Sequence, residues 1–170
     1  MLHRLSLLIL IGALGSGCAE TGVLPPVAKA APATTPAFLR VPLTTIDGEA
    51  TDLAQAADGH VVVVALWATW CDACQKELPA LVRLEAKAKA RGDFRVLAVA
   101  VGDEREAVDA FSKKHGLAFA RLLDNDFALA NGLGTNRVPT TLVIDRDGRI
   151  IHQGGALDRA ALEVLRNALP

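Results

Sequence analysis

The chain has 170 residues, 51% of them hydrophobic, and carries 18 Lys and Arg against 19 Asp and Glu. This near balance of charge argues against a protein that binds nucleic acid or an anionic membrane through a basic face. The length suits one domain behind a short leader, and the apolar content excludes intrinsic disorder for most of the chain. The three cysteines, at positions 18, 71 and 74, are too few for a small domain stapled by disulfides.

The first seventeen residues have the order of an export signal. A positive start at Arg4 is followed by an apolar run over residues 5–14, and three small residues then lead to Cys18. This run is about half the ~20 residues that span a bilayer. We therefore predict a signal peptide over residues 1–17. A buried N-terminal helix with an incidental cysteine is the structural alternative.

The same segment resembles the lipobox of bacterial lipoproteins, in which the cysteine is acylated and becomes the mature N-terminus. The resemblance implies that Cys18 anchors an exported chain to the membrane, in the bacterial periplasm or on the cell-envelope face. That family prefers Leu three residues before the cysteine, where this chain has Gly15, so ordinary signal-peptidase cleavage stays open. Residues 18–37 contain four of the eight prolines, which predicts an extended tether before the domain at 38–170.

From residue 38 onward short apolar runs alternate with longer amphipathic ones, the order of an α/β domain. Continuous apolar runs over residues 61–66 and 94–101 predict strands buried on both faces. We expect further strands at 39–41, 44–46, 119–123, 140–144 and 149–153, and helices at 72–90, 104–115, 125–131 and 158–169.

Cys71 and Cys74 lie where the first buried strand gives way to the first long helix. A helix N-terminus favours an anion, which lowers the pKa of a thiol there and raises its thiolate fraction. Cys74 lies one turn further along, on the apolar stripe. We therefore expect Cys71 to attack disulfides and Cys74 to resolve the product, with Trp67 and Trp70 as an apolar docking surface.

A zinc site and a structural disulfide are the alternatives for this pair. Structural zinc requires four ligands, and the histidines at positions 3, 60, 115 and 152 offer no second ligand pair. A disulfide that closes so short a loop removes little chain entropy. We expect neither a metal nor a cofactor.

The segment LWATWCDACQKELPAL, residues 66–81, resembles the active-site segment of thioredoxin-like proteins of the TlpA/ResA type, and GTNRVPTTLVIDRDGRI resembles their later cis-proline segment. The resemblance covers nearly all of residues 38–170. It implies a thioredoxin-like fold with a central mixed β-sheet flanked by helices, an N-terminal hairpin and a helix-strand insertion at 103–133. It also implies a cis Val138–Pro139 bond, which lets the backbone of Val138 pair with an extended substrate. From composition alone, Pro139 is a proline at a strand start.

This chain departs from that family at two positions. The residue before the second cysteine is usually Pro and is Ala73 here, which leaves the redox potential open. Thioredoxins proper keep a buried Asp six residues before the first cysteine, where this chain has Ala65. Glu77, which matches CxxCxxE in the family, is our candidate to move the proton instead, because helical side chains lean toward the N-terminus. A solvated surface glutamate is the alternative.

These features predict an exported, membrane-tethered dithiol-disulfide oxidoreductase. Asp72 and Ala73 place no positive charge between the cysteines, which favours a reductant over an oxidant. The resemblance implies a membrane thiol carrier as electron donor. It implies disulfide-containing client proteins, among them apocytochromes c, in cytochrome c biogenesis, and copper-site assembly proteins.

Two other functions use the same cysteines. A Cu(I)-binding chaperone would use both thiolates, yet no Met remains after the leader to supply a third soft ligand. Thiol peroxidases of the peroxiredoxin type have the pattern P-x-x-x-T/S-x-x-C around the peroxidatic cysteine. In this chain Val64 and Ala68 occupy the positions of the Pro and the Thr or Ser, and Thr69 is one residue out of register. We expect a monomer without a nucleic-acid partner.

Overall fold

The structure is a computed structural model that describes residues 35–117, 119 and 121–170. The predicted signal peptide, Cys18 and nearly all of the predicted tether lie outside these residues. In the described part of the chain, no helix is long and apolar enough to cross a membrane.

One mixed sheet of seven strands organises these residues, in the order β2-β1-β5-β4-β3-β6-β7. Its central strands β3, β4 and β5 are parallel, whereas the strands on either side of them run antiparallel. The strands are β1 (Leu43–Thr45), β2 (Ala50–Thr51), β3 (Val61–Trp67), β4 (Phe94–Val101), β5 (Arg121–Asp124), β6 (Thr140–Ile144) and β7 (Ile150–Gly154).

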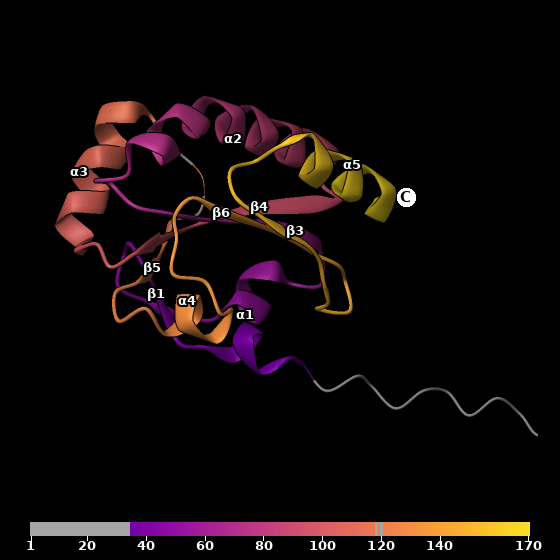
Figure 1. Ribbon diagram of the computed structural model, residues 1–170, viewed down its shortest axis with the longest axis horizontal. Coiled ribbons are helices and arrows are strands. Elements are labelled where there is room, and N and C mark those ends of the chain that lie inside the picture. Colours follow the sequence, from indigo (N-terminus) through magenta and orange to yellow (C-terminus); the bar gives the residue numbers. More distant parts are fainter. Residues whose placement is uncertain (1–34, 118, 120) are drawn as a thin grey trace, which may run out of the picture. The chain divides into compact units, whose positions relative to one another are not determined.

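Helices cover both faces of the sheet (Figure 1). The long helices α2 (Asp72–Arg91), α3 (Arg105–His115) and α5 (Arg159–Ala168) lie on one face, and the short helices α1 (Leu53–Ala57) and α4 (Ala128–Gly132) lie on the other. All seven residues of β3 are buried, and their side chains alternate between the two hydrophobic clusters on either side of the sheet. A continuous apolar run is therefore needed here, because neither face of β3 meets water.

The predicted fold class is confirmed, including the mixed sheet, the N-terminal hairpin of β1 and β2, and the inserted α3 and β5. Strands predicted at 94–101 and 140–144 have the observed bounds. The strand predicted at 39–41 is wrong: residues Ala37–Arg40 form a 3-10 turn, because only Leu39 of them is buried. Helix α1 was not predicted.

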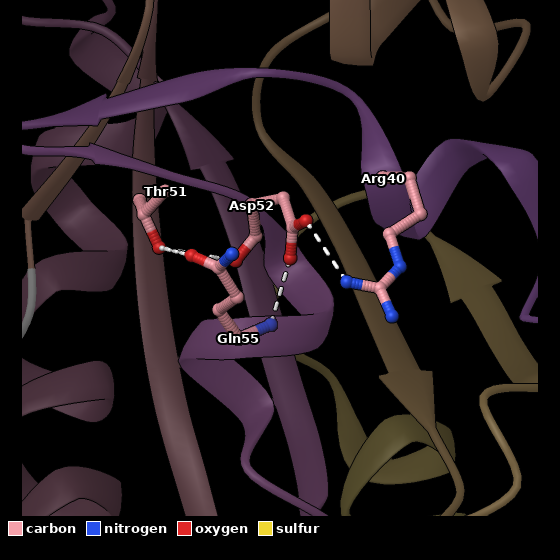
Figure 2. Close-up of polar contacts among 4 residues, drawn as sticks. All are labelled: Arg40, Thr51, Asp52 and Gln55. Atoms are coloured by element: carbon pink, nitrogen blue, oxygen red, sulfur yellow. Dashed lines mark hydrogen bonds and ion pairs between the residues drawn. The ribbon is translucent and has the colours of Figure 1, made fainter.

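The short helix α1 depends on polar contacts that no apolar period reveals. The Asp52 carboxylate accepts the Gln55 backbone N–H at 2.7 Å, which caps the helix, and pairs with the Arg40 guanidinium at 3.3 Å (Figure 2). Thr51 lies within 3.4 Å of the Gln55 side chain. An N-cap of this kind stabilises a helix by about 1 kcal/mol.

The site lies at one edge of the sheet because of this topology. The parallel strands β3, β4 and β5 all end at that edge. Strand β6 begins there, since it runs antiparallel to β3 with Thr140 opposite Leu66. The segments after β3, β4 and β5 therefore meet the segment before β6 at this edge. They include both cysteines, after β3, and the proline loop before β6.

Candidate active site

Cys71 and Cys74 form a disulfide at the start of α2. Cys71 is the N-cap of that helix, and its Sγ accepts the backbone N–H of Cys74 at 3.1 Å. Its side chain is 7% exposed against 1% for Cys74, so the order of exposure is as predicted, although Cys71 is itself buried in the disulfide form. The same N–H group and the helix dipole favour a thiolate at Cys71 once the disulfide is reduced.

The loop between β3 and Cys71 is held by a buried carboxylate. Asp103, just beyond the end of β4, accepts the backbone N–H of Thr69 at 2.7 Å and its hydroxyl at 2.8 Å. From α2, the Gln75 side chain donates to the Thr69 carbonyl at 3.0 Å. Thr69 is therefore fixed through its N–H, hydroxyl and carbonyl, two residues before the first cysteine.

A second buried carboxylate fixes the neighbouring loop. Asp124, at the end of β5, accepts the backbone N–H groups of Leu129 and Ala130, each at 3.0 Å. Asn125 links the two loops, because its side chain donates to the Asp103 carbonyl at 3.0 Å. The ends of β3, β4 and β5 are thus joined by hydrogen bonds into one framework beneath the site.

Glu77 lies on the buried face of α2, one turn beyond Cys74. Its Oε1 accepts the Leu157 N–H at 2.8 Å and the Thr141 hydroxyl at 3.4 Å, while its buried Oε2 has no hydrogen-bond partner. Burial raises the pKa of this carboxyl, and the two hydrogen bonds offset that rise only in part. The alternative of a solvated surface glutamate is therefore wrong.

Thr141 links Glu77 to the level of Ala65 in the sheet. Thr141 pairs with Ala65 across β3 and β6, and its hydroxyl donates to Glu77. The glutamate of α2 thus brings a buried carboxylate to the level of the sheet where thioredoxins carry an aspartate on the strand itself.

The two predicted docking tryptophans have different environments. Trp70 is 65% exposed beside the disulfide, which suits a contact surface. Trp67 is 2% exposed and packs on Phe111 with ring centroids 5.4 Å apart. The prediction that Trp67 belongs to an exposed docking surface is wrong, because it is the last residue of a strand buried on both faces.

The predicted cis bond between Val138 and Pro139 is present. Val138 is half-buried and packs against the hydrophobic cluster that contains both cysteines. Pro139 directly precedes β6, so the residue before it lies at the sheet edge where β3 ends. Substrate binding by Val138 and Pro139 stays a prediction.

The Redoxin family matches residues 26–166. The chain belongs to this family. It is also 31% identical over 144 residues to the thiol-disulfide oxidoreductase ResA of Geobacillus kaustophilus, a match that covers 85% of this chain and 80% of ResA. ResA of Geobacillus thermodenitrificans is 29% identical, and the match covers 88% of this chain and 83% of that ResA.

Solved structures agree with this assignment. MTB DsbF superposes with a TM-score of 0.66 at 26% identity, covering 78% of this chain and 98% of DsbF. A thioredoxin-like structure from Neisseria meningitidis gives 0.64 at 29% identity, covering 75% and 88%. The redoxin domain is a thioredoxin-like thiol-disulfide oxidoreductase, and its substrates are disulfide-containing proteins.

Sequence reasoning missed Asp103 and Asp124, which hold the site together. Asp103 lies two residues beyond the end of the buried strand β4, and Asp124 is the last residue of β5. The available signal is a carboxylate at the end of consecutive parallel strands, because such ends share one edge of the sheet. It identifies the edge without identifying the partner, Thr69.

Glu77→Gln should stabilise the disulfide form at neutral pH. The folded carboxyl has a pKa raised above its ordinary value of 4.5, so the unfolded chain loses this proton first and stability falls as pH rises through the interval between the two values. Gln keeps the acceptor for Leu157 without the buried charge. Denaturant unfolding at a series of pH values should show a gain that is largest at pH 7 and shrinks toward pH 4.5.

Glu85→Gln, on the same helix, is the matched control. Glu85 pairs with Lys89 at 2.7 Å, so its loss should bring no gain at neutral pH. A Glu77→Gln effect that stays constant across this pH range would contradict the assignment of a buried, titrating carboxylate.

Proposed function

We propose that this redoxin domain is an exported, membrane-tethered reductant of disulfides in client proteins. The observation that carries the proposal is the disulfide at the N-terminus of α2, with a buried carboxylate one turn behind it. The first feature favours a nucleophilic thiolate at Cys71. The second provides an acceptor for the proton of the other cysteine.

The reaction is two successive thiol-disulfide exchanges. The Cys71 thiolate attacks one sulfur of the client disulfide, forms a mixed disulfide and releases the second client sulfur as a thiolate. The Cys74 thiolate then attacks Cys71 Sγ and releases the first client sulfur. The client gains two electrons, the domain ends as the Cys71–Cys74 disulfide, and an external dithiol must restore it.

Glu77 serves the second exchange. Cys74 is 1% exposed, so water has little access to its proton. A carboxyl with a raised pKa is a better proton acceptor near neutral pH than an ordinary glutamate, because acceptor strength rises with pKa. The unpaired Oε2 is the oxygen free to take this proton.

The direction of electron flow follows from the charge around Cys71. The helix N-terminus stabilises the thiolate, but Asp72 is the adjacent charge and Ala73 adds none. A strongly oxidising pair requires a more stabilised thiolate than this. We assign the domain to reduction, with a membrane thiol carrier as donor and apocytochrome c or copper-site assembly proteins as clients.

Trapping of mixed disulfides tests the roles of the cysteines. In Cys74→Ser the mixed disulfide forms and cannot be resolved, so clients should accumulate in covalent complexes on non-reducing gels. Cys71→Ser should form none, because Cys74 is nearly inaccessible. Equal trapping by both variants would overturn the assigned roles.

Lipidation at Cys18 has its own test. Cys18→Ser removes the thiol that the lipobox resemblance assigns to the lipid. The redoxin domain should remain folded, as judged by its far-ultraviolet circular dichroism, and should move from the membrane to the soluble fraction. Identical fractionation of the wild-type and variant chains would exclude the lipid anchor.

A further inference from the structure

A groove beside the disulfide collects the most exposed aromatic side chains of the described residues. Trp70 is 65% exposed and Phe127 is 46% exposed, and both line a groove of about 470 Å³. The other exposed large apolar residues of the described part, Val82, Ile151 and Leu162, do not line it. Exposed apolar area that gathers in one groove indicates a binding surface.

Phe127 occupies an unusual backbone position in this groove. Its φ of 61° lies in the left-handed region, which a bulky side chain rarely adopts. Hydrogen bonds on either side hold it there: its N–H donates to the Asp124 carbonyl at 3.3 Å, and the Asp124 carboxylate binds the N–H groups of the helix that follows. Backbone preference does not account for an aromatic residue here, and nearly half of its surface stays exposed, which indicates a role for the ring in the groove.

The ring of Phe127 packs against the backbone at Gly102. Gly102 has a φ of 66°, and a Cβ atom added there would collide with the ring. The absence of that side chain lets the ring lie against the loop after β4. The orientation of Phe127 is therefore set by its own backbone and by Gly102, and a ring fixed in this way loses little entropy when it binds a partner.

Two residues that line the groove adjoin the reacting centre along the chain. Trp70 directly precedes Cys71, and Val138, the residue before the cis-proline, lines the same groove together with Leu66. A client segment that reacts at Cys71 therefore passes close to this groove, which makes a segment of the client chain its expected occupant.

The charge of the groove restricts this segment further. Arg137 is the one ionisable residue among those that line it, and within the described residues it is exposed and has no ion-pair partner. A cation beside an apolar groove favours an acidic residue and disfavours a basic one.

We propose that this groove binds the client residues next to the client disulfide and selects among them by sequence. A bulky apolar side chain of the client lies between Trp70 and Phe127, and an acidic side chain faces Arg137. Phe127 is thereby a specificity-determining residue. The proposal rests on the proposed function, since it assumes that clients react at Cys71.

Matched disulfide peptides test the apolar part. Each is a cyclic peptide with one disulfide, and the set differs only in the residue beside one cysteine: Phe, Leu or Ser. The reduced full chain should reduce the Phe and Leu peptides about tenfold faster than the Ser peptide, the usual scale for one apolar contact. In Phe127→Gly, which suits the left-handed backbone, this ratio of rate constants should fall close to one.

Leu162→Ala, on α5 and outside the groove, is the control and should keep the tenfold ratio. An unchanged ratio in Phe127→Gly would overturn the proposal, as would the absence of any preference in the wild-type chain. 2-Hydroxyethyl disulfide is too small to reach the groove, so it separates a failure of the proposed function from a failure of the groove proposal. If the wild-type chain reduces neither it nor the peptides, the proposed function fails; if it reduces all equally, the groove proposal alone fails.

A second pair of peptides tests Arg137. With Glu or Lys two residues from the cysteine, the wild-type chain should prefer Glu about threefold to tenfold at low salt, and the preference should shrink as salt screens it. Arg137→Gln should abolish the preference. A Glu preference that survives Arg137→Gln would remove this arginine from the proposal.

Discussion

The two hydrogen bonds from Thr69 to the buried Asp103 carboxylate are the contact on which the active site depends. They tie the loop before Cys71 to the end of β4, so the first cysteine meets the start of α2 in a fixed position. That position makes Cys71 an N-cap whose sulfur accepts a backbone N–H. The chemistry of the dithiol therefore starts from a contact between residues 34 positions apart in sequence.

The dithiol is placed between two opposing electrostatic effects. The helix N-terminus favours negative charge at Cys71, whereas the buried carboxyl of Glu77 resists a second negative charge nearby. Glu77 is held by the Leu157 N–H and the Thr141 hydroxyl, neither of which belongs to the dithiol. The proposed reduction requires a pair in which one cysteine attacks and the other resolves in every cycle.

The pattern of the chain predicts most of the fold and the reactive pair. The sequence pattern predicts β3, β4 and β6, because strands that are buried on both faces of a sheet contain few charged residues. The pattern fails where polar contacts determine structure, as in α1, whose five residues depend on the Asp52 cap. It also fails for the partner of Asp103, the burial of Trp67 and the orientation of Phe127, since each depends on which segments meet at the edge of the sheet. Cys71 and Cys74 are predicted from their local spacing at the start of one helix, whereas Glu77 is predicted from its place on that helix together with the resemblance to the TlpA/ResA family.

The equilibrium redox potential of the Cys71–Cys74 pair tests most directly whether the domain is a reductant. It should be measured on the full chain against glutathione or dithiothreitol buffers, with the thiols quenched by alkylation. We expect a value below about −180 mV, nearer to thioredoxin at about −270 mV, because Asp72 and Ala73 place no positive charge between the cysteines to stabilise the thiolate beyond the effect of the helix N-terminus. A value near −120 mV, as in the oxidant DsbA, would contradict the assignment.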